Sequence, residues 1–468
     1  MKIAIIGGGS AGLACAVSVA QAVREAGLEG KIENKINIIL LEKQQRVGRK
    51  LLATGNGRCN LGNTSCELKF YHSTAPEVLA QILQIFDSTK TIEFFRNLGL
   101  LLHEEEGRLY PYSQQASAVL DVLRRKAEES GVSECCGHHV VGIKIPKTQS
   151  AHENHEGPLT FTLTLASGEH LTAERVIVAC GGLAAPQMGS GGDGYRLLRE
   201  CGHTLEPTFP ALVSVKIADP ALRALKGLRV KALVELLTPV GECLGQERGE
   251  VQFTEYGVSG IAVMQVSRHV GRLERELLER RHDSRPKKGP PKNRQEIIQQ
   301  QASHRHKDPG IAHLRLDLLE SWQEEELTRW LGERVQNAPM RKLEDFLVGI
   351  VPKRVGQILL RHIGLDLRTT TDTLTQEDTR AIAHILKNWL LPISATTSWQ
   401  HAQVTAGGIH LNEFIPQTLE SRLVPGLYAA GEVLDVDGNC GGYNLQWAWA
   451  SGYLAGRAAA LSFIQSES

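Results

Sequence analysis

The chain has 468 residues, of which 42% are hydrophobic and 22% charged, a composition that can bury enough apolar surface to fold. This length exceeds the roughly 250 to 300 residues at which a single core stops growing, so two or three domains are expected. Because 52 Lys and Arg balance 52 Asp and Glu, the net charge gives no sign of a nucleic-acid partner, and none is expected.

The N-terminal segment predicts a strand, a turn and a helix. Residues 2–6 form a short β-branched apolar run that ends at glycines, which is typical of a buried parallel strand. A helix is expected from 11 to about 26 and a second strand over 36–41. The apolar start is also compatible with a signal peptide, but glycines at 7, 8, 9 and 12 would interrupt its apolar helix, which argues against secretion.

The next elements continue an α/β pattern. A helix is expected near 114–130, strands at 139–145 and 176–179, and a half-buried strand with two-residue alternation at 161–165. From about residue 206 this rhythm stops and β-rich segments begin. These include strands expected at 212–217 and 230–237, so an inserted domain is predicted here.

The central part of the chain ends in helices. Residues 277–309 have almost no apolar content and predict a mobile surface loop. Helical signals follow at 324–331, 353–362 and 377–390, and after Pro392 a β pattern returns before a last helix from about 444 to 463. The predicted domains are 1–205 as the first part of a nucleotide-binding domain, 206–316 as the β-rich insertion, 317–395 as a helical subdomain and 396–468 as the second part of the first domain.

The six residues after the first strand carry the strongest chemical signal. Gly7-Gly8-Gly9-Ser10-Ala11-Gly12 fits G-x-G-x-x-G between a strand and a helix, which is the context that the dinucleotide fingerprint requires. Gly7 permits a tight turn, Gly9 lets a pyrophosphate approach the backbone, and Gly12 lets helix and strand pack closely. Ser10 and Ala11 open the helix, whose N-terminus attracts phosphate. Glu42 ends the second strand and is expected to bind the adenosine ribose hydroxyls, although a solvated strand-end charge is the alternative.

The C-terminal region favours FAD over NAD. The predicted strand at 428–430 ends in Gly431-Glu432, an arrangement that in two-dinucleotide-fold flavoproteins places a carboxylate near the ribityl chain and pyrophosphate. The glycine-rich 437–444 segment then opens the final helix, whose dipole can stabilise the negative charge of reduced flavin. No second G-x-G-x-x-G follows a strand, so a separate NAD(P) domain is not expected.

Four segments, 54–60, 253–260, 404–408 and 430–447, closely resemble the YhiN/BaiN-type family of NAD(P)/FAD-dependent oxidoreductases. The resemblance covers nearly the whole chain. It implies a Rossmann-like α/β flavoprotein domain with two dinucleotide-binding motifs, interrupted by a β-barrel-like domain and a small helical subdomain. Members include aminoacetone oxidases and reductases of steroid dienones, so the family does not fix the substrate.

The resemblance also implies which residues surround FAD. The loop 54–60 would wrap the cofactor, with Arg58, Cys59 and Asn60 nearest the ring system, and Val140 would contact adenine through its backbone. The complete predicted set is Gly7, Gly9, Ser10, Ala11, Gly12, Glu42, Lys43, Lys50, Leu52, Thr54, Gly55, Asn56, Gly57, Arg58, Cys59, Asn60, Val140, Gly181, Gly431, Glu432, Gly442 and Asn444.

Catalytic groups are less defined. Cys59 and Cys440 are candidate redox thiols, but neither is in C-x-x-C and a small side chain fits a glycine-rich loop equally well. His410 and Tyr443 are candidate proton donors, with structural roles as the alternative. The histidines show no convincing metal-ligand spacing, so no metal is expected.

The leading functional hypothesis is a cytoplasmic FAD-dependent oxidoreductase that acts on a small organic molecule, with NAD(P)H as transient electron donor or oxygen as acceptor. A FAD-dependent RNA-modifying enzyme and a non-enzymatic flavin redox sensor are the alternatives. The insertion, with 253–254 and 257–260 nearest the ring, is expected to line the substrate pocket. No apolar run approaches the roughly 20 residues needed to span a bilayer, and nine cysteines without a repeated framework favour reduced thiols.

Overall fold

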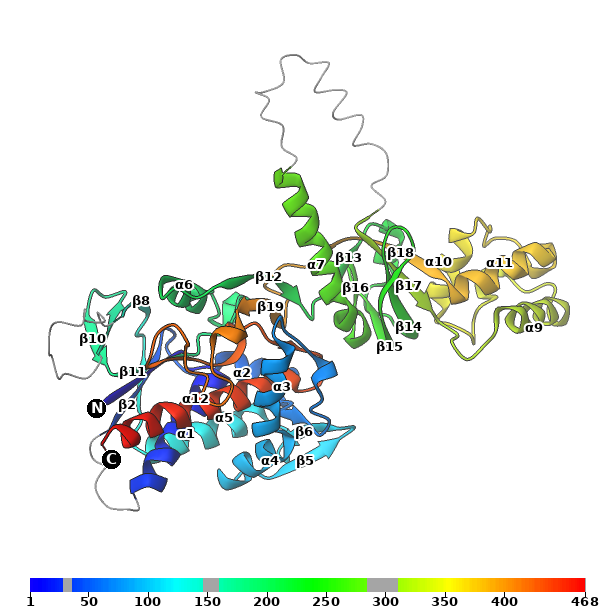
Figure 1. Cartoon of the computed structure of the whole chain (residues 1–468). Helices are drawn as coiled ribbons and strands as arrows, with labels where there is room; N and C mark the ends of the chain where they lie inside the picture. The colour runs from blue at the N-terminus through cyan, green and yellow to red at the C-terminus, as the bar shows by residue number, and fades with distance from the viewer. Residues whose placement is uncertain (28–35, 146–159, 284–309, 468) are drawn as a thin grey trace, which may run out of the picture. The chain divides into compact units, whose positions relative to one another are not determined.

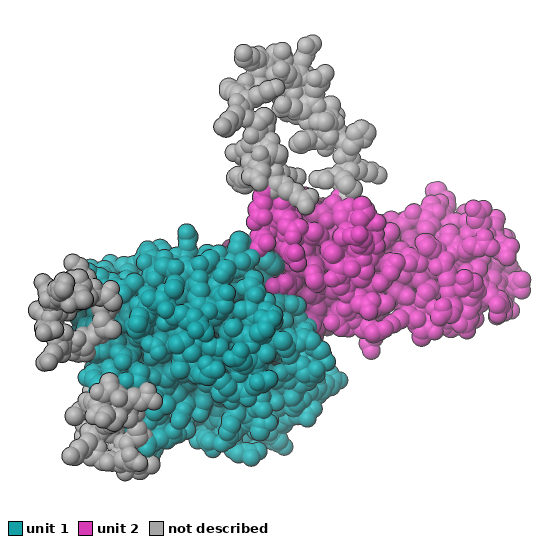
Figure 2. All heavy atoms as spheres, viewed as in Figure 1, with its two compact units in different colours: residues 1–209, 403–468 teal, residues 210–402 magenta. Residues whose placement is uncertain are grey.

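The computed structural model describes residues 1–27, 36–145, 160–283 and 310–467. The chain forms two compact units, which Figure 2 shows in different colours. Unit 1 contains residues 1–209 and 403–468, and unit 2 contains residues 210–402. Unit 1 is therefore built from both ends of the sequence, with unit 2 inserted between them.

The centre of unit 1 is a parallel sheet with the strand order β20-β11-β1-β2-β7. Ile5 of β1 pairs with Leu40 on one side and Ile177 on the other, and all three side chains are buried. Parallel strands that are buried on both faces read as continuous apolar runs, which explains why these strands are recognisable in the sequence. Their bounds are β1 Lys2–Ile6, β2 Asn37–Glu42, β7 Ser133–Cys136, β11 Arg175–Val178 and β20 Leu427–Ala429.

Two helices from opposite ends of the chain pack together in unit 1. Helix α1 (Ser10–Gly27) lies beside the C-terminal helix α12 (Tyr443–Glu467), the blue and red helices of Figure 1. A Cβ added at Gly452 would lie 2.6 Å from the Ala11 carbonyl oxygen, and one at Gly456 would lie 2.5 Å from that of Cys15. These two glycines therefore let the helix backbones approach closely.

Shorter elements surround the sheet of unit 1. The antiparallel meander β8-β9-β10 crosses from β7 to β11, and β12 pairs with β19. A hairpin, β5-β6, pairs with β3. Their bounds are α2 Arg49–Ala53, β3 Gly62–Asn63, β4 Tyr71–His72, α3 Pro76–Ile85, α4 Ser88–Asn97, β5 Leu102–Glu105, β6 Arg108–Pro111, α5 Ala116–Glu129, β8 Val140–Lys144, β9 Phe161–Leu165, β10 His170–Ala173, α6 Asp193–Glu200, β12 Leu205–Ala211, β19 Val404–Ile409 and β21 Asp437–Gly438.

Unit 2 contains a closed barrel with the strand order β13-β16-β15-β14-β17-β18. Helix α7 (Ile261–Asp283) packs on the barrel strands through Ala262, Val263 and Val266, which are buried in one core with the strands. The strand bounds are β13 Val215–Ile217, β14 Arg229–Leu237, β15 Cys243–Phe253, β16 Gly257–Ser259, β17 Ala312–Asp317 and β18 Trp389–Thr396.

Three helices follow β17 and precede β18 in the sequence: α9 (Glu324–Asn337), α10 (Lys353–His362) and α11 (Gln376–Lys387). They share one hydrophobic core with the barrel. Helix α11 begins with a capping box in which Thr375 and Asp378 satisfy each other's backbone N–H groups, the arrangement that stabilises a helix start.

The structure corrects two predictions about unit 2. The helix predicted over 377–390 ends at Lys387, and Trp389–Thr396 is a barrel strand inside the range predicted to be helical. Trp389, Leu391 and Ile393 are buried while Leu390 is 52% exposed, which is the two-residue period of a strand. Of the predicted loop 277–309, residues 277–283 continue helix α7, and 284–309 lie outside the described residues.

Candidate cofactor site

The fingerprint glycines divide into two that pack the fold and one that faces open space. A Cβ at Gly7 would lie 2.5 Å from the Ala179 carbonyl oxygen, and one at Gly12 would lie 1.8 Å from that of Gly7. Gly7 also has a φ of 108°. Both positions therefore require glycine whether or not a ligand is bound. At Gly9 an added Cβ would have no neighbour within 4 Å.

The space beside Gly9 lies at the N-terminus of α1. The first N–H groups of an α-helix lack partners within the helix, and its dipole is positive there. Ser10 and Ala11 open this helix of 18 residues, so their N–H groups and the open side of Gly9 suit a pyrophosphate. This open space fits a dinucleotide cofactor, whose pyrophosphate approaches the backbone at this glycine of the fingerprint.

Glu42 is fixed beside the fingerprint by two backbone groups. Its Oε2 accepts a hydrogen bond from the Gly8 N–H and its Oε1 accepts one from the Gln44 N–H, both at 2.8 Å. A carboxylate can accept about four hydrogen bonds, so acceptor capacity remains for ribose hydroxyls. The Glu42 carbonyl oxygen accepts from the His138 N–H at 2.9 Å, which places the start of β8, with Val140, near the same edge of the sheet.

Lys43 is held by an acidic partner. Its ammonium lies 2.5 Å from an Asp193 carboxylate oxygen, and the other Asp193 oxygen lies 3.3 Å from His139 Nε2. Asp193 is the first residue of α6 and was not singled out from the sequence. Because its charge is neutralised by Asp193, Lys43 is not an unpaired cation, and its ion pair links the end of β2 to α6.

Helix α2 connects the fingerprint to the C-terminal part of unit 1. The Gly48 N–H donates to the Gly8 carbonyl oxygen at 2.8 Å, and Lys50 forms a 2.7 Å ion pair with Glu432. The other Glu432 carboxylate oxygen accepts from the Thr405 N–H at 2.8 Å. Leu52 on the same helix packs against the core. The structure thus brings Lys50 and Glu432, which are far apart in the sequence, into one network.

The loop after α2 has an unusual backbone. Gly55, Asn56, Gly57 and Cys59 all have positive φ, between 55° and 85°. Thr54 begins the loop and its hydroxyl donates to the Leu51 carbonyl oxygen at 2.6 Å. Burial raises the pKa of the Cys59 thiol to about 12, so this side chain is a protonated thiol at neutral pH, which weakens the case for a redox thiolate.

The loop ends against the start of α12. With its amide oriented to donate to the Gly62 carbonyl oxygen at 2.8 Å, Asn60 accepts from the Gly442 N–H at 3.2 Å. Gly442 has a φ of 100°, and a Cβ there would lie 2.4 Å from the Gly62 oxygen. Asn444 closes the glycine-rich segment by accepting from the Gly438 N–H at 2.8 Å and donating to the Gly438 carbonyl oxygen at 2.7 Å.

These contacts form a continuous cradle from the fingerprint, along α2, to the N-terminus of α12. If the adenosine ribose binds at Glu42 and the pyrophosphate at Gly9, as the sequence predicts, the ring system of FAD would lie farther along the cradle, where loop 54–60 meets Gly442. We call this second region the flavin end. Gly431 lies along the cradle, held by Ser451, which accepts from its N–H at 2.9 Å, and by Trp447, which donates to its carbonyl oxygen at 3.0 Å.

The four catalytic candidates are not brought together by the described contacts. Tyr443 stacks on Phe70 with ring centroids 4.8 Å apart, and burial raises the pKa of its hydroxyl. Cys440 is half-buried in the glycine-rich segment. His410 follows β19, and its Nε2 lies 3.4 Å from a Glu206 carboxylate oxygen. Tyr443 and Cys440 are thus close in sequence to Gly442 at the flavin end, whereas His410 is paired with Glu206 of strand β12.

Thr405 is a residue at this site that the sequence analysis did not single out. It is fully buried, its hydroxyl accepts from the Leu183 and Ala184 N–H groups at 2.8 and 3.0 Å, and its own N–H binds Glu432. A Cβ at Gly182 would lie 2.3 Å from this hydroxyl, so the segment that includes Gly181 packs tightly on it. The only sequence signal was its place in the 404–408 motif.

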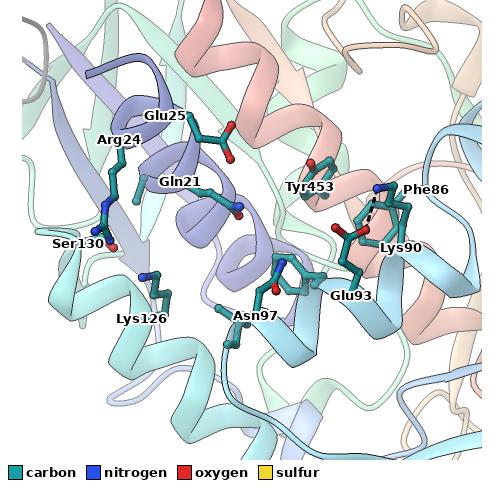
Figure 3. Close-up of a pocket in the computed structure, with 13 residues that line it drawn as sticks. Gln21, Arg24, Glu25, Phe86, Lys90, Glu93, Asn97, Lys126, Ser130 and Tyr453 are labelled. Atoms are coloured by element: carbon teal, nitrogen blue, oxygen red, sulfur yellow. Dashed lines mark hydrogen bonds and ion pairs between the residues drawn. The ribbon is translucent and has the colours of Figure 1, made fainter. Parts of the chain in front are cut away.

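One hollow in the surface of unit 1 lies elsewhere. Figure 3 shows a pocket of about 320 Å³ lined by Gln21, Arg24, Phe86, Lys126 and Tyr453, among others. Gln21 and Arg24 belong to the C-terminal turns of α1, whereas Gly9 precedes the first turn of this helix. Lys90 and Glu93 on the pocket rim pair with each other at 2.7 Å. This hollow is separate from the cradle.

Comparison with known proteins identifies the family. A model described as the HI0933-like protein Rossmann domain matches residues 1–458. The chain belongs to this family. The 3-dehydro-bile acid Δ(4,6)-reductase of Clostridium scindens is 36% identical over 98% of this chain and 99% of its own length. The ribosomal RNA dihydrouridine synthase of Escherichia coli K12 is 28% identical over 96% of this chain and 95% of its own.

A solved structure also aligns over 98% of this chain and 96% of its own. It is a 3-ketosteroid-Δ4-(5α)-dehydrogenase from Rhodococcus jostii, with 15% identity and a TM-score of 0.41. The family match and the reductase relative confirm the predicted family, the Rossmann-type fold class and the FAD-dependent oxidoreductase activity of this chain. Among the described residues no helix is both long and apolar enough to cross a membrane.

Proposed function

We propose that this protein uses FAD to reduce a carbon–carbon double bond that is conjugated to a carbonyl group in a ring. The 36% identical relative is named for reduction of ring double bonds in a 3-keto bile acid. The 28% identical relative is named for making dihydrouridine, a pyrimidine saturated at the double bond next to a ring carbonyl. The substrates in these two names differ in size, but in both the reduced bond is a ring double bond conjugated to a carbonyl group. This agreement is the observation that carries the proposal.

Different residues of the cradle are proposed to bind different parts of FAD. The N–H groups of Ser10 and Ala11 would bind the pyrophosphate, and Glu42 would bind the adenosine ribose. Glu432, whose charge is balanced by Lys50, would bind the middle of the cofactor. The chemistry that FAD would supply when bound is hydride transfer to the substrate, with NAD(P)H as the proposed electron donor. With no second dinucleotide fingerprint in the sequence, the nicotinamide donor would reach the flavin directly. Oxygen is the alternative electron acceptor.

Reduction of the double bond also consumes a proton. The donor has to carry its proton at neutral pH and lie at the flavin end. Tyr443 meets the first condition because a tyrosine hydroxyl ordinarily loses its proton only at about pH 10 and burial raises this pKa further. It is also the first residue of α12, beside Gly442. We propose it ahead of His410, which is paired with Glu206.

A small cytoplasmic ring enone is favoured over RNA as substrate. The small-molecule reductase is the more similar of the two relatives, and the chain has no excess of Lys and Arg over Asp and Glu to attract a polyanion. Uridine in RNA is the second candidate, and the family relative named for it is the observation that supports it.

Two measurements test the proposal. Heat release of the cofactor should yield FAD, and recovery of FMN alone would refute the assignment of the cradle. The flavin is then reduced by NADH or NADPH without oxygen and mixed with a steroid dienone, a simple ring enone or a uridine-containing RNA. Flavin reoxidation with gain of two hydrogens by an enone supports the proposal. Gain of two hydrogens by the uridine of the RNA alone supports the second candidate. A reduced flavin that none of these substrates reoxidises, and that only added oxygen reoxidises, contradicts both candidates.

A further inference from the structure

We propose that Gln114 is a positioning residue that holds the guanidinium of Arg58 at the flavin end, and that Arg58 binds the carbonyl oxygen of the substrate. The second part rests on the proposed function. The first part does not, since it concerns contacts within unit 1. Gln114 lies outside the motifs that identify the family and more than 50 residues beyond Arg58 in the sequence.

Three neighbours fix the Arg58 side chain. Its Nε donates to the Gln114 amide oxygen and its Nη2 to the Glu105 carboxylate. The guanidinium also lies over the Tyr110 ring, 4.3 Å from the ring centroid, a distance at which cation and ring attract each other. Glu105 and Tyr110 come from the two strands of the β5-β6 hairpin, so this hairpin and Gln114 together orient a residue of loop 54–60.

Gln114 also binds a second side chain. Its amide nitrogen donates to His103 Nε2, and His103 pairs with Tyr110 across the hairpin. Because its oxygen and its nitrogen are both engaged, the Gln114 side chain has one orientation, and that orientation sets the position of Arg58. A side chain that served only to cover the surface would not need both ends of its amide bound.

The backbone at Gln114 is strained. Its φ is 56°, a region that residues with a Cβ adopt at a cost in free energy. Among the described residues, seven that are not glycine have positive φ, and four of them, Asn56, Cys59, Glu106 and Gln114, belong to loop 54–60 or to the hairpin segment that contacts it. Strain of this kind persists where surrounding contacts impose it, and it gathers at functional sites.

Arg58 retains donors for a ligand. The two hydrogen bonds use Nε and Nη2, and the guanidinium has five N–H groups, so the Nη1 hydrogens remain for a third acceptor. The side chain is 39% exposed, which leaves it accessible. A fixed cation that binds the carbonyl oxygen of a conjugated ring draws electrons from the double bond and favours hydride addition. The geometry therefore fits an uncharged planar ring that carries a carbonyl.

The test compares two glycine substitutions in the same hairpin segment. Gln114→Gly removes both side-chain bonds and relieves the backbone strain. Glu106→Gly relieves a similar strain, since the φ of Glu106 is 52°, at an exposed side chain with no described contact to Arg58. Glu106→Gly should leave the melting temperature of the FAD-loaded protein within about 2 °C of the wild type, because the relieved strain offsets the greater flexibility of the unfolded chain. Gln114→Gly should lower it further only by the loss of its two side-chain bonds.

Only Gln114→Gly should change the flavin. Arg58→Ala removes a cation near the ring system and should lower the midpoint potential of the flavin, because a cation stabilises reduced anionic flavin. Gln114→Gly should shift the potential in the same direction and raise the KM for a ring enone about tenfold, the loss of one charge-assisted hydrogen bond. In the Arg58→Ala background Gln114→Gly should have no further effect.

A Gln114→Gly protein with an unchanged potential, or with the same shift in the Arg58→Ala background, would overturn the positioning role. Should the glycine variant fail to fold, Gln114→Asn replaces it, because Asn tolerates positive φ and is too short to reach both partners. If the wild-type protein reduces no enone, the proposed function fails, while the potentials still decide whether Gln114 positions Arg58.

Discussion

Gly9 and Gly12 should respond in opposite ways to the same substitution. Gly9→Ala places a methyl group where the structure has no atom within 4 Å, and the backbone at Gly9 does not require positive φ. The protein without FAD should therefore keep its stability or gain about 0.4 to 1 kcal/mol from a less flexible unfolded chain. Gly12→Ala places the methyl 1.8 Å from the Gly7 oxygen, so α1 must shift, at a cost of about 1 to 3 kcal/mol or more.

FAD binding separates the variants further. In Gly9→Ala the methyl group takes the place that the pyrophosphate approaches, and loss of one charge-assisted hydrogen bond is worth about 1.5 to 3 kcal/mol. The dissociation constant should rise by about 10- to 150-fold, and the larger Gly9→Val should carry no cofactor. Thermal unfolding of the apo proteins and titration with FAD by flavin fluorescence measure both quantities. A Gly9→Ala protein that binds FAD as tightly as the wild type would refute the pyrophosphate site.

Three further predictions concern single side chains. Glu432→Gln should weaken FAD binding by about 1 to 3 kcal/mol in the same titration, and unchanged affinity would show that Glu432 serves the protein alone. Since burial raises the pKa of Cys59 to about 12, iodoacetamide should leave it unmodified in the native protein at pH 7.5, as read by peptide mass spectrometry; rapid labelling would contradict this. Burial also lowers the pKa of His203 below its ordinary 6.5, so the folded state resists protonation and the free energy of unfolding should fall as pH drops below about 6.5. His203→Gln should flatten that fall in urea titrations at several pH values, and an equally steep fall would disprove it.

The elements that the sequence predicted well are those with a local signal. The strand at residues 2–6, the fingerprint and helix α1 follow one another within 27 residues, and each has a pattern that depends on its own residues. Helix α10 was predicted with its observed bounds, because apolar residues repeat along one face and the segment begins after Pro352.

Other elements depend on distant partners. Strand β12 contains Pro207 and Pro210, which argue against a strand by propensity, and it forms because β19 lies beside it. Strand β15 is rich in charged and polar residues from Gln246 to Glu250 and is defined by its pairing with β14. The sequence shows neither pairing.

The residues of the cradle also differ in whether their role depends on a local sequence pattern or on distant partners. Gly9 and Glu42 could be proposed from the sequence because their places in the βαβ unit give each an expected role. Thr405 and Gln114 were not predicted. Thr405 acts through a buried hydroxyl that binds backbone groups of another loop, and Gln114 acts through an amide whose two partners, Arg58 and His103, are distant from it in the sequence.

The split of unit 1 across the chain sets an order for synthesis. Strand β20 and helix α12 are translated after the whole of unit 2, and α12 supplies both the packing surface of α1 and the start of the flavin end. A ribosome-bound chain that has emerged only to residue 402 holds the fingerprint without its partner helix, while the barrel and its helices have their own core and can fold as a unit. Flavin loading is therefore a late event, and chains truncated before Leu427 should accumulate without colour and expose the apolar face of α1 to chaperones.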